Sequence, residues 1–225
     1  YIDTHSHIYP DAISQKATGS TCRFYNVTTD HSGTASELLR LDKEVGIVRS
    51  VLLPVSVNPV HTASINNFTL RECEEHPEFV PFATMHAANE DMEEQAEKFV
   101  ERGFKGVKIH PDMQQFNIDD ERMFPLYDII AGKIPLTVHS GDPRYTYSHP
   151  ERIRRILHEF PRLTVIAAHM GAWSMQKEAL PLLKNEERCF TDTSSALSAM
   201  TVDAAMMYIN AYGVERVMYG SDYPI

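Results

Sequence analysis

Cysteine is scarce in this sequence, with three residues in a chain of 225. Cys22, Cys73 and Cys189 are widely separated, and none has the closely spaced partner that a zinc knuckle or a redox motif requires. We therefore interpret them as reduced thiols that bind no metal.

Positively charged residues are also fewer than negatively charged ones, and long apolar runs are absent. The 21 Lys and Arg residues face 31 Asp and Glu residues, for a net charge of -10. A nucleic-acid partner is excluded on this ground, because such proteins neutralise phosphates with clustered basic residues. Apolar runs such as Leu163–Ala168 are far shorter than the roughly 20 residues of a membrane-spanning helix, and no signal-peptide pattern opens the sequence. We expect a cytoplasmic protein with no membrane partner.

Several motifs of common enzyme classes are missing. The sequence has no Gly-x-Ser-x-Gly elbow, no Gly-x-Gly-x-x-Gly fingerprint and no Gly-x-x-x-x-Gly-Lys-Ser/Thr loop. These absences argue against a serine hydrolase, a dinucleotide enzyme and a nucleotide phosphatase. No repeat or Pro/Gly-rich linker divides the chain either, so we expect one domain over residues 1–225.

What the sequence does contain is a regular alternation of short β-branched or aromatic runs with longer amphipathic segments. That rhythm predicts parallel strands joined by helical crossovers. The predicted strands are Tyr1–His7, Val48–Val57, Phe79–His86, Phe104–Pro111, Ile134–Ser140, Leu163–Gly171, Cys189–Ser195 and Arg216–Tyr223. The predicted helices include Ser36–Val45, Glu93–Arg102, Asp119–Ala131, Pro150–Phe160, Met175–Lys184 and Thr201–Tyr212.

Eight strands with seven helices between them predict the α/β class and a (β/α)8 barrel of the TIM type. An eighth helix is expected after Ile225, because the outer faces of the neighbouring strands would otherwise be exposed to water. The longest irregular stretch, Ile8–Gly33, follows the first strand. It therefore belongs to the end of the barrel where active-site loops gather.

A His-x-His pair lies in the first predicted strand, in Asp3-Thr4-His5-Ser6-His7. Because side chains alternate along a strand, both imidazoles point to one side and could bind the same ion. The pair alone is weak evidence, since the two histidines could be ordinary polar residues of a strand.

Three further polar residues stand at the C-terminal ends of predicted strands. They are His139 and His169, each followed by Gly within two residues, and Asp222 in Gly220-Ser221-Asp222-Tyr223-Pro224. Strand ends converge on one mouth in a barrel, so these residues can surround a single point together with the His-x-His pair. Imidazole and carboxylate ligands suit Zn²⁺, Mn²⁺, Fe²⁺ or Co²⁺ better than Mg²⁺ or Ca²⁺.

The order of these motifs resembles that of the amidohydrolase superfamily over the whole chain. Within the superfamily it is similar to the amidohydrolase-2 group, which includes aminocarboxymuconate-semialdehyde decarboxylase and related hydrolases. The resemblance implies that His5, His7 and His139 bind a metal ion. It further implies that Asp222 is both a ligand and the base that orients or deprotonates water, and that His169 is a catalytic neighbour. A buried histidine bonded to the backbone is the alternative for His169.

The fourth predicted strand offers two more candidates on its interior face, Lys108 and His110. Some relatives carboxylate a lysine on this strand to bridge two metals, so a binuclear site is one alternative. A Lys108 that pairs with a carboxylate such as Asp192 is the other. His110 is expected to contact the substrate.

Loops at the strand ends supply the remaining candidates for substrate binding. An arginine there could bind a substrate carboxylate, and an aromatic ring could cover an apolar portion. Solvent-facing loop residues are the alternative interpretation. The candidates are Tyr9, Arg23, Tyr25, Arg144, Tyr145 and Trp173.

Three functions compete at this point. The first is hydrolysis of an amide, lactone or ester bond of a small molecule by water activated on a mononuclear ion, for which zinc is the expected metal. The second is non-oxidative decarboxylation of a small unsaturated or aromatic acid, which the resembling group also performs. The third is a barrel that binds a metal or small molecule without turnover. Monomer and homodimer both stay open.

Overall fold

The computed structural model describes residues 1–225 in full. The strands are β1 (Ile2–Ser6), β2 (Arg49–Leu52), β3 (Phe79–Pro81), β4 (Ala83–Thr84), β5 (Val107–Ile109), β6 (Leu136–Val138), β7 (Val165–Ala167), β8 (Cys189–Asp192) and β9 (Val217–Met218). The α-helices are α1 (Ser14–Tyr25), α2 (Ala35–Val45), α3 (Thr62–Glu75), α4 (Met92–Glu101), α5 (Pro111–Gln114), α6 (Phe124–Ile130), α7 (Pro150–Glu159), α8 (Gln176–Leu183) and α9 (Val202–Tyr212). Short 3-10 turns cover Pro59–His61, Glu121–Met123, Leu197–Ala199 and Val214–Arg216.

The strands are parallel and pair in the order in which they occur along the chain. They form two sheets, β1-β2-β3 and β4-β5-β6-β7-β8-β9. The third predicted strand, Phe79–His86, is split between these sheets. The N–H of Phe82 still donates to the Leu52 carbonyl of β2 (3.2 Å), whereas the N–H of Ala83 donates to the Gly106 carbonyl before β5 (2.8 Å). One strand therefore changes neighbours and joins the two sheets.

The second junction between the two sheets lies between β1 and the segment that follows β9. The N–H of Thr4 donates to the Tyr219 carbonyl (2.9 Å), the N–H of Asp222 donates to the His5 carbonyl (2.9 Å), and Ser6 forms a parallel bridge with Tyr223. Hydrogen bonds thus connect both edges of the two sheets. This is the eight-strand arrangement of a TIM barrel, as the alternation of elements predicted.

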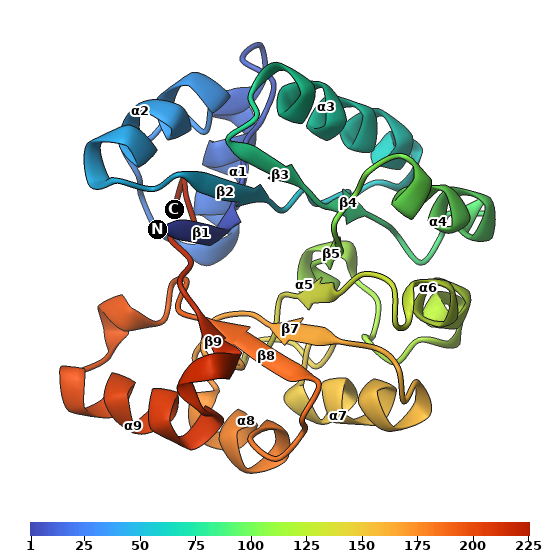
Figure 1. Ribbon diagram of the computed structural model, residues 1–225, viewed down its shortest axis with the longest axis vertical. Coiled ribbons are helices and arrows are strands. Elements are labelled where there is room, and N and C mark those ends of the chain that lie inside the picture. The colour runs from blue at the N-terminus through green and yellow to red at the C-terminus, as the bar shows by residue number, and fades with distance from the viewer.

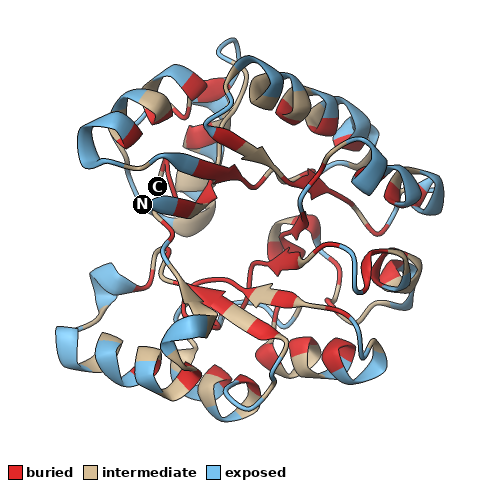
Figure 2. Ribbon diagram, in the orientation of Figure 1, coloured by how far each residue is buried: buried red, intermediate tan, exposed pale blue.

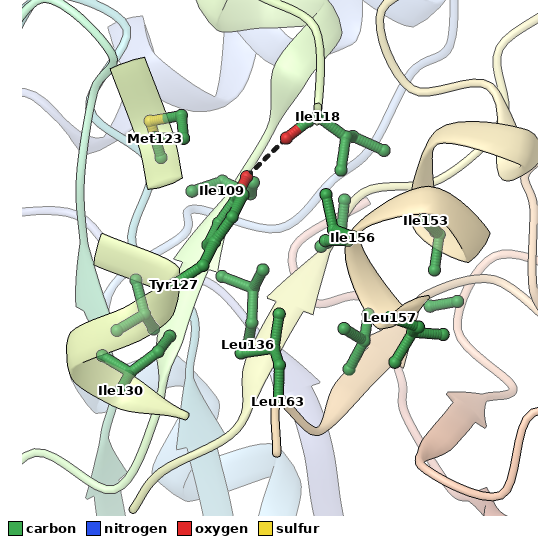
Figure 3. Packing of buried hydrophobic residues seen from close by; sticks show 14 of the residues in the cluster. Ile109, Ile118, Met123, Tyr127, Ile130, Leu136, Ile153, Ile156, Leu157 and Leu163 are labelled. Carbon is green, nitrogen blue, oxygen red and sulfur yellow. Dashed lines mark hydrogen bonds between the residues drawn. The ribbon is translucent and has the colours of Figure 1, made fainter. Parts of the chain in front are cut away.

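Helices cover the outside of the strands (Figure 1). Their outward faces are exposed while most of the strand residues are buried (Figure 2). The main core lies between strands and helices: Leu136 of β6 and Leu163 pack with Tyr127 and Ile156, and Tyr127 donates a 2.7 Å hydrogen bond to the Ile118 carbonyl (Figure 3). No helix is long and apolar enough to cross a membrane.

The alternation of side chains predicted for the fourth strand is confirmed. Val107 and Ile109 of β5 belong to the core, whereas Lys108 and His110 line the cavity inside the barrel mouth. Because side chains alternate along a strand, apolar burial of one set directs the other set inwards.

The segment Ile8–Gly33 differs from the sequence-based prediction, since it contains α1 rather than only irregular structure. The helix buries only Ser14 and Thr18 and lacks an apolar stripe, which is why periodicity did not reveal it. Tertiary contacts hold it instead: Thr18 donates to the Ser32 carbonyl (3.3 Å), and Arg144 donates to the carbonyl of Phe24 (2.6 Å).

Candidate metal centre

His5 and His7 sit at the end of β1 and both point into a cavity of about 1650 Å³ at the C-terminal ends of the strands. The Nδ1–H of His5 donates to the carboxylate of Asp192 (2.9 Å), and the Nδ1–H of His7 donates to the carbonyl of Leu53 (2.6 Å). In a neutral imidazole the other nitrogen is then an acceptor. Both histidines therefore present the Nε2 lone pair to the cavity.

The Oδ1 atom of Asp222 lies where these two lone pairs meet. It is 3.3 Å from His5 Nε2 and 3.4 Å from His7 Nε2. Lone pairs and a carboxylate oxygen repel one another unless a cation lies among them. Ligand atoms placed tetrahedrally at zinc–nitrogen distances of about 2.0–2.1 Å are about 3.3–3.4 Å apart. The three residues thus fit a divalent transition ion.

The backbone at Asp222 is unusual, with φ of +66° in the left-handed region. Non-glycine residues rarely adopt this conformation, although Asp tolerates it better than most. Ser195 donates a short hydrogen bond to Oδ2 of the carboxylate, and the Asp222 N–H is bonded to the His5 carbonyl. These contacts aim Oδ1 at the two histidines.

The electrostatics keep the imidazoles of His5 and His139 neutral and the carboxylate of Asp222 charged. Burial and the charge of Lys108 lower the pKa of His5 to about 4. Burial also holds the pKa of His139 well below its usual range, as do the neighbouring imidazoles. Burial alone would raise the pKa of Asp222, but His5, His7 and His169 outweigh it and hold that pKa well below normal. These are the protonation states that metal ligands require.

His169 and His139 occupy the same cavity but differ in their partners. The Nδ1–H of His169 donates to the Ser194 carbonyl (3.0 Å), which leaves Nε2 to accept from His139 Nδ1 (2.9 Å). Donor atoms of His5, His169 and Asp222 lie within 4.8 Å of one another, whereas His139 groups in the same way with His110 and Asp112. The structure therefore groups His169 with His5 and Asp222, and the assignment of His139 as a ligand stays a prediction.

Lys108 contacts the centre directly. Its ammonium donates to His5 Nε2 (3.2 Å), and burial lowers the pKa of the amine to about 8. The ion pair with Asp192 that the sequence left open does not form, because the carboxylate is bonded to His5 and Ser194 instead. Lys108 is thus positioned beside the candidate ligands, and its ammonium bonds to the His5 lone pair that an ion would take.

The candidates for substrate binding divide into two sets. Tyr9, His110 and Trp173 line the cavity, whereas Arg23 and Arg144 do not. Arg23 is exposed on α1. Arg144 uses its guanidinium to bind Asp142 (2.6 Å) and the Phe24 carbonyl (2.6 Å). The prediction of Arg23 and Arg144 as substrate ligands is therefore corrected: one faces solvent, and the other holds α1 in place.

Two residues, Asp192 and Asp3, support the metal centre in a way that the sequence-based prediction did not assign to them. Asp192 is fully buried and receives hydrogen bonds from His5, from Ser194 and from the N–H of His169 (3.1 Å). Asp3 accepts from the N–H groups of His5 and Ser221 (both 3.0 Å) and so links β1 to the loop that carries Asp222. Asp192 lies within the predicted strand Cys189–Ser195 and is the last residue of β8, so only the observed strand end places it beside His139 and His169.

Comparison with known proteins places this geometry in a family. The model of the amidohydrolase family matches residues 2–225, and no curated protein matches the chain. An amidohydrolase from Burkholderia multivorans with bound HEPES has 13% sequence identity and a TM-score of 0.67, covering 99% of this chain and 84% of that one. The structure of the same protein with bound zinc has 14% sequence identity and a TM-score of 0.64, and it covers the same shares of the two chains.

A further structural relative is 4-oxalomesaconate hydratase from Rhodopseudomonas palustris. It has 17% identity and a TM-score of 0.63, covering 99% of this chain and 82% of that one. At these identities the structures establish the common barrel fold, while the family model spans nearly every residue. The chain is a member of the amidohydrolase family.

Proposed function

We propose that this protein is a metal-dependent hydrolase that cleaves an amide, lactone or ester bond of a small molecule. The observation that carries the proposal is the meeting of the His5 and His7 lone pairs at Asp222 Oδ1, at 3.3 and 3.4 Å. His139 is proposed as the remaining ligand. Zinc suits three imidazoles and one carboxylate, and Mn²⁺, Fe²⁺ or Co²⁺ would also be accepted.

A divalent ion at this position would lower the pKa of bound water and polarise the substrate carbonyl. The chain's own residues would do the rest. Asp222, kept ionised by its surroundings, would accept the proton of the attacking water. His169, whose Nδ1–H is bonded to the Ser194 carbonyl, would stabilise the oxyanion that develops on the substrate as the imidazolium, which adds an Nε2–H donor. The cavity, which Tyr9, His110 and Trp173 help to line, would hold the rest of the molecule.

Decarboxylation of a small unsaturated or aromatic acid is the second candidate. It is favoured by the cationic side chains Lys16, Arg71 and Lys108 that line the cavity against the two carboxylates of Asp112 and Asp222. Lys16 and Arg71 could hold a substrate carboxylate in this cavity. The cytoplasmic location stays a prediction, and a homodimer stays one of the two open oligomeric states.

The proposed function is tested on protein dialysed against chelator and then reconstituted with zinc. We expect about one equivalent of bound ion and hydrolysis of some member of a panel of carboxylated lactones, amides and esters. Hydrolysis should vanish with chelator and return with zinc. Muconate-like acids are assayed in parallel for release of CO2. Turnover that persists without metal, or CO2 release without any hydrolysis, would contradict the proposal.

A further inference from the structure

A second group of polar side chains lies beside His139, and the proposed reaction leaves it unused. Tyr25 from the end of α1 places its Oη atom 2.6 Å from His110 Nε2 and 3.3 Å from His139 Nε2. Asp112 of α5 places Oδ2 3.8 Å from His139 Nε2. The rings of His110 and His139 stack at 3.9 Å. Tyr25, His110 and Asp112 all line the cavity.

The direction of the hydrogen bonds at Tyr25 follows from the backbone. The N–H of Met113 donates to His110 Nδ1 (3.3 Å), so the proton of this neutral imidazole lies on Nε2. That Nε2–H donates to Tyr25 Oη, which leaves the phenol its own O–H to donate. A phenol is protonated at neutral pH, so Tyr25 keeps this O–H, and the nearest acceptor for it is His139 Nε2 at 3.3 Å. Tyr25 is therefore a hydrogen-bond donor at the cavity wall.

Asp112 offers the complementary acceptor. Its Oδ2 accepts a hydrogen bond from Ser148, whereas Oδ1 is buried and has no partner. The residue is 2% exposed. An unpaired buried acceptor costs about 1–3 kcal/mol, and more when it is charged, so a rotation of the carboxylate that brought Oδ1 to a donor in the cavity would be favourable.

The donor is held firmly in place. Arg144 is bonded to Asp142 and to the Phe24 carbonyl, and its guanidinium lies 4.9 Å from the centre of the Phe24 ring. Trp173 meets the Tyr25 ring edge-on at 5.2 Å. Because these contacts fix the end of α1, the position of the Tyr25 hydroxyl is set before any substrate arrives. The same aromatic rings provide an apolar surface next to it.

We propose that Tyr25, His110 and Asp112 form a subsite that binds a hydroxyl or carboxamide group of the substrate. Tyr25 donates to the oxygen of that group, Asp112 accepts its O–H or N–H, and His110 orients Tyr25. A carboxylate has no proton to offer Asp112 and is repelled by its charge, so the subsite selects neutral groups. The inference rests on the proposed function in taking this cavity to be the substrate site.

A second metal ion is the competing occupant. Donor atoms of His110, Asp112 and His139 lie within 4.8 Å of one another. The proton that Met113 forces onto His110 Nε2 argues against it, because a nitrogen that carries a proton has no lone pair for an ion. The zinc stoichiometry of the protein decides between these occupants.

The test uses four small probes of the same shape: benzamide, benzyl alcohol, benzoate and toluene. Their dissociation constants are measured by ligand-observed NMR on the zinc-loaded protein and again after chelation, when benzoate has no ion to bind. In both forms we expect benzamide and benzyl alcohol to bind about 10-fold more tightly than toluene, as roughly one net hydrogen bond to a charged group implies. In the chelated form benzoate should bind more weakly than benzamide.

Two variants then separate the donor from the acceptor. Tyr25→Phe should weaken the binding of benzamide and benzyl alcohol about 5- to 10-fold and leave toluene unchanged. Asp112→Asn should shift the preference toward benzoate, because asparagine can donate to a carboxylate and no longer repels it. Tyr147→Phe and Asp128→Asn make the same chemical changes outside the cavity and should alter nothing. Thermal melting checks that each variant is folded.

Equal affinities for benzamide, benzoate and toluene in the wild-type protein would overturn the subsite, and this comparison needs no variant. Unchanged probe affinities in a folded Tyr25→Phe protein would overturn it too. So would a second equivalent of zinc that disappears in Asp112→Asn. If the panel shows no hydrolysis while the probe ranking holds, the proposed hydrolysis fails and the subsite is still supported.

Discussion

Replacing Asp222 by asparagine is expected to lower turnover of the zinc-loaded protein about 1,000-fold, within the range for loss of a general base. The amide keeps nearly the same shape and can still accept from Ser195, but it cannot take a proton from water. It also carries no charge to balance the ion that His5 and His7 would hold. Turnover and zinc content are measured on the same samples.

The matched control for this change is Asp128→Asn, which removes an exposed carboxylate on α6 and should retain full activity. A companion variant, His169→Ala, is expected to retain the ion and to lose about 100-fold in turnover, as removal of one oxyanion stabiliser does. An Asp222→Asn protein with unimpaired rate would remove the proposed base. A His169→Ala protein without zinc would make His169 a ligand, consistent with its closeness to His5 and Asp222.

Replacing either histidine of β1 by alanine is expected to empty the metal centre, with different effects on stability. Zinc content after dialysis should fall below about a tenth of the wild-type value in both His5→Ala and His7→Ala, because each change removes a direct ligand. His5→Ala should also lower the free energy of unfolding of the metal-free protein by about 2–3 kcal/mol. The reason is that Asp192, fully buried and charged, loses the N–H of His5.

His7→Ala should cost less stability, about 1 kcal/mol, since His7 donates only to the neutral carbonyl of Leu53 and is partly exposed. Elemental analysis and urea denaturation of the chelated proteins measure the two effects. His158→Ala, which removes an exposed histidine paired with Glu186, is the control and should change neither. Equal stability of the two β1 variants would show that the bond to Asp192 contributes little, and full zinc content in either would refute its role as a ligand.

The barrel and much of the candidate site could be predicted because they depend on local patterns. Alternation along a strand placed His5 and His7 on one side and separated Lys108 and His110 from the core residues Val107 and Ile109. His169 and Asp222 lie 53 residues apart, yet both stand near the C-terminal end of a strand. Because the strands pair in sequence order around the barrel, this position brings both side chains to the same mouth. Parallel strands make such positions equivalent, whatever separates them along the chain.

Helix α1 and the role of Arg144 could not be predicted in this way. The helix has almost no buried apolar residue, so no period marks it, and its stability comes from contacts with residues distant in sequence. Arg144 looked available for a substrate because its sequence neighbours do not reveal that Asp142 and the Phe24 carbonyl occupy its guanidinium. Loop residues acquire their partners only when the chain is folded.

The sequence by itself determined the class of the fold and the side chains that could bind an ion, since burial and periodicity follow from neighbouring residues. The tertiary structure alone decided how those side chains are oriented. His5 and Asp192 are 187 residues apart, yet their hydrogen bond selects the nitrogen that His5 presents to the cavity. Hydrogen bonds between strands and loops fix tautomers and directions, and no local pattern of residues encodes them.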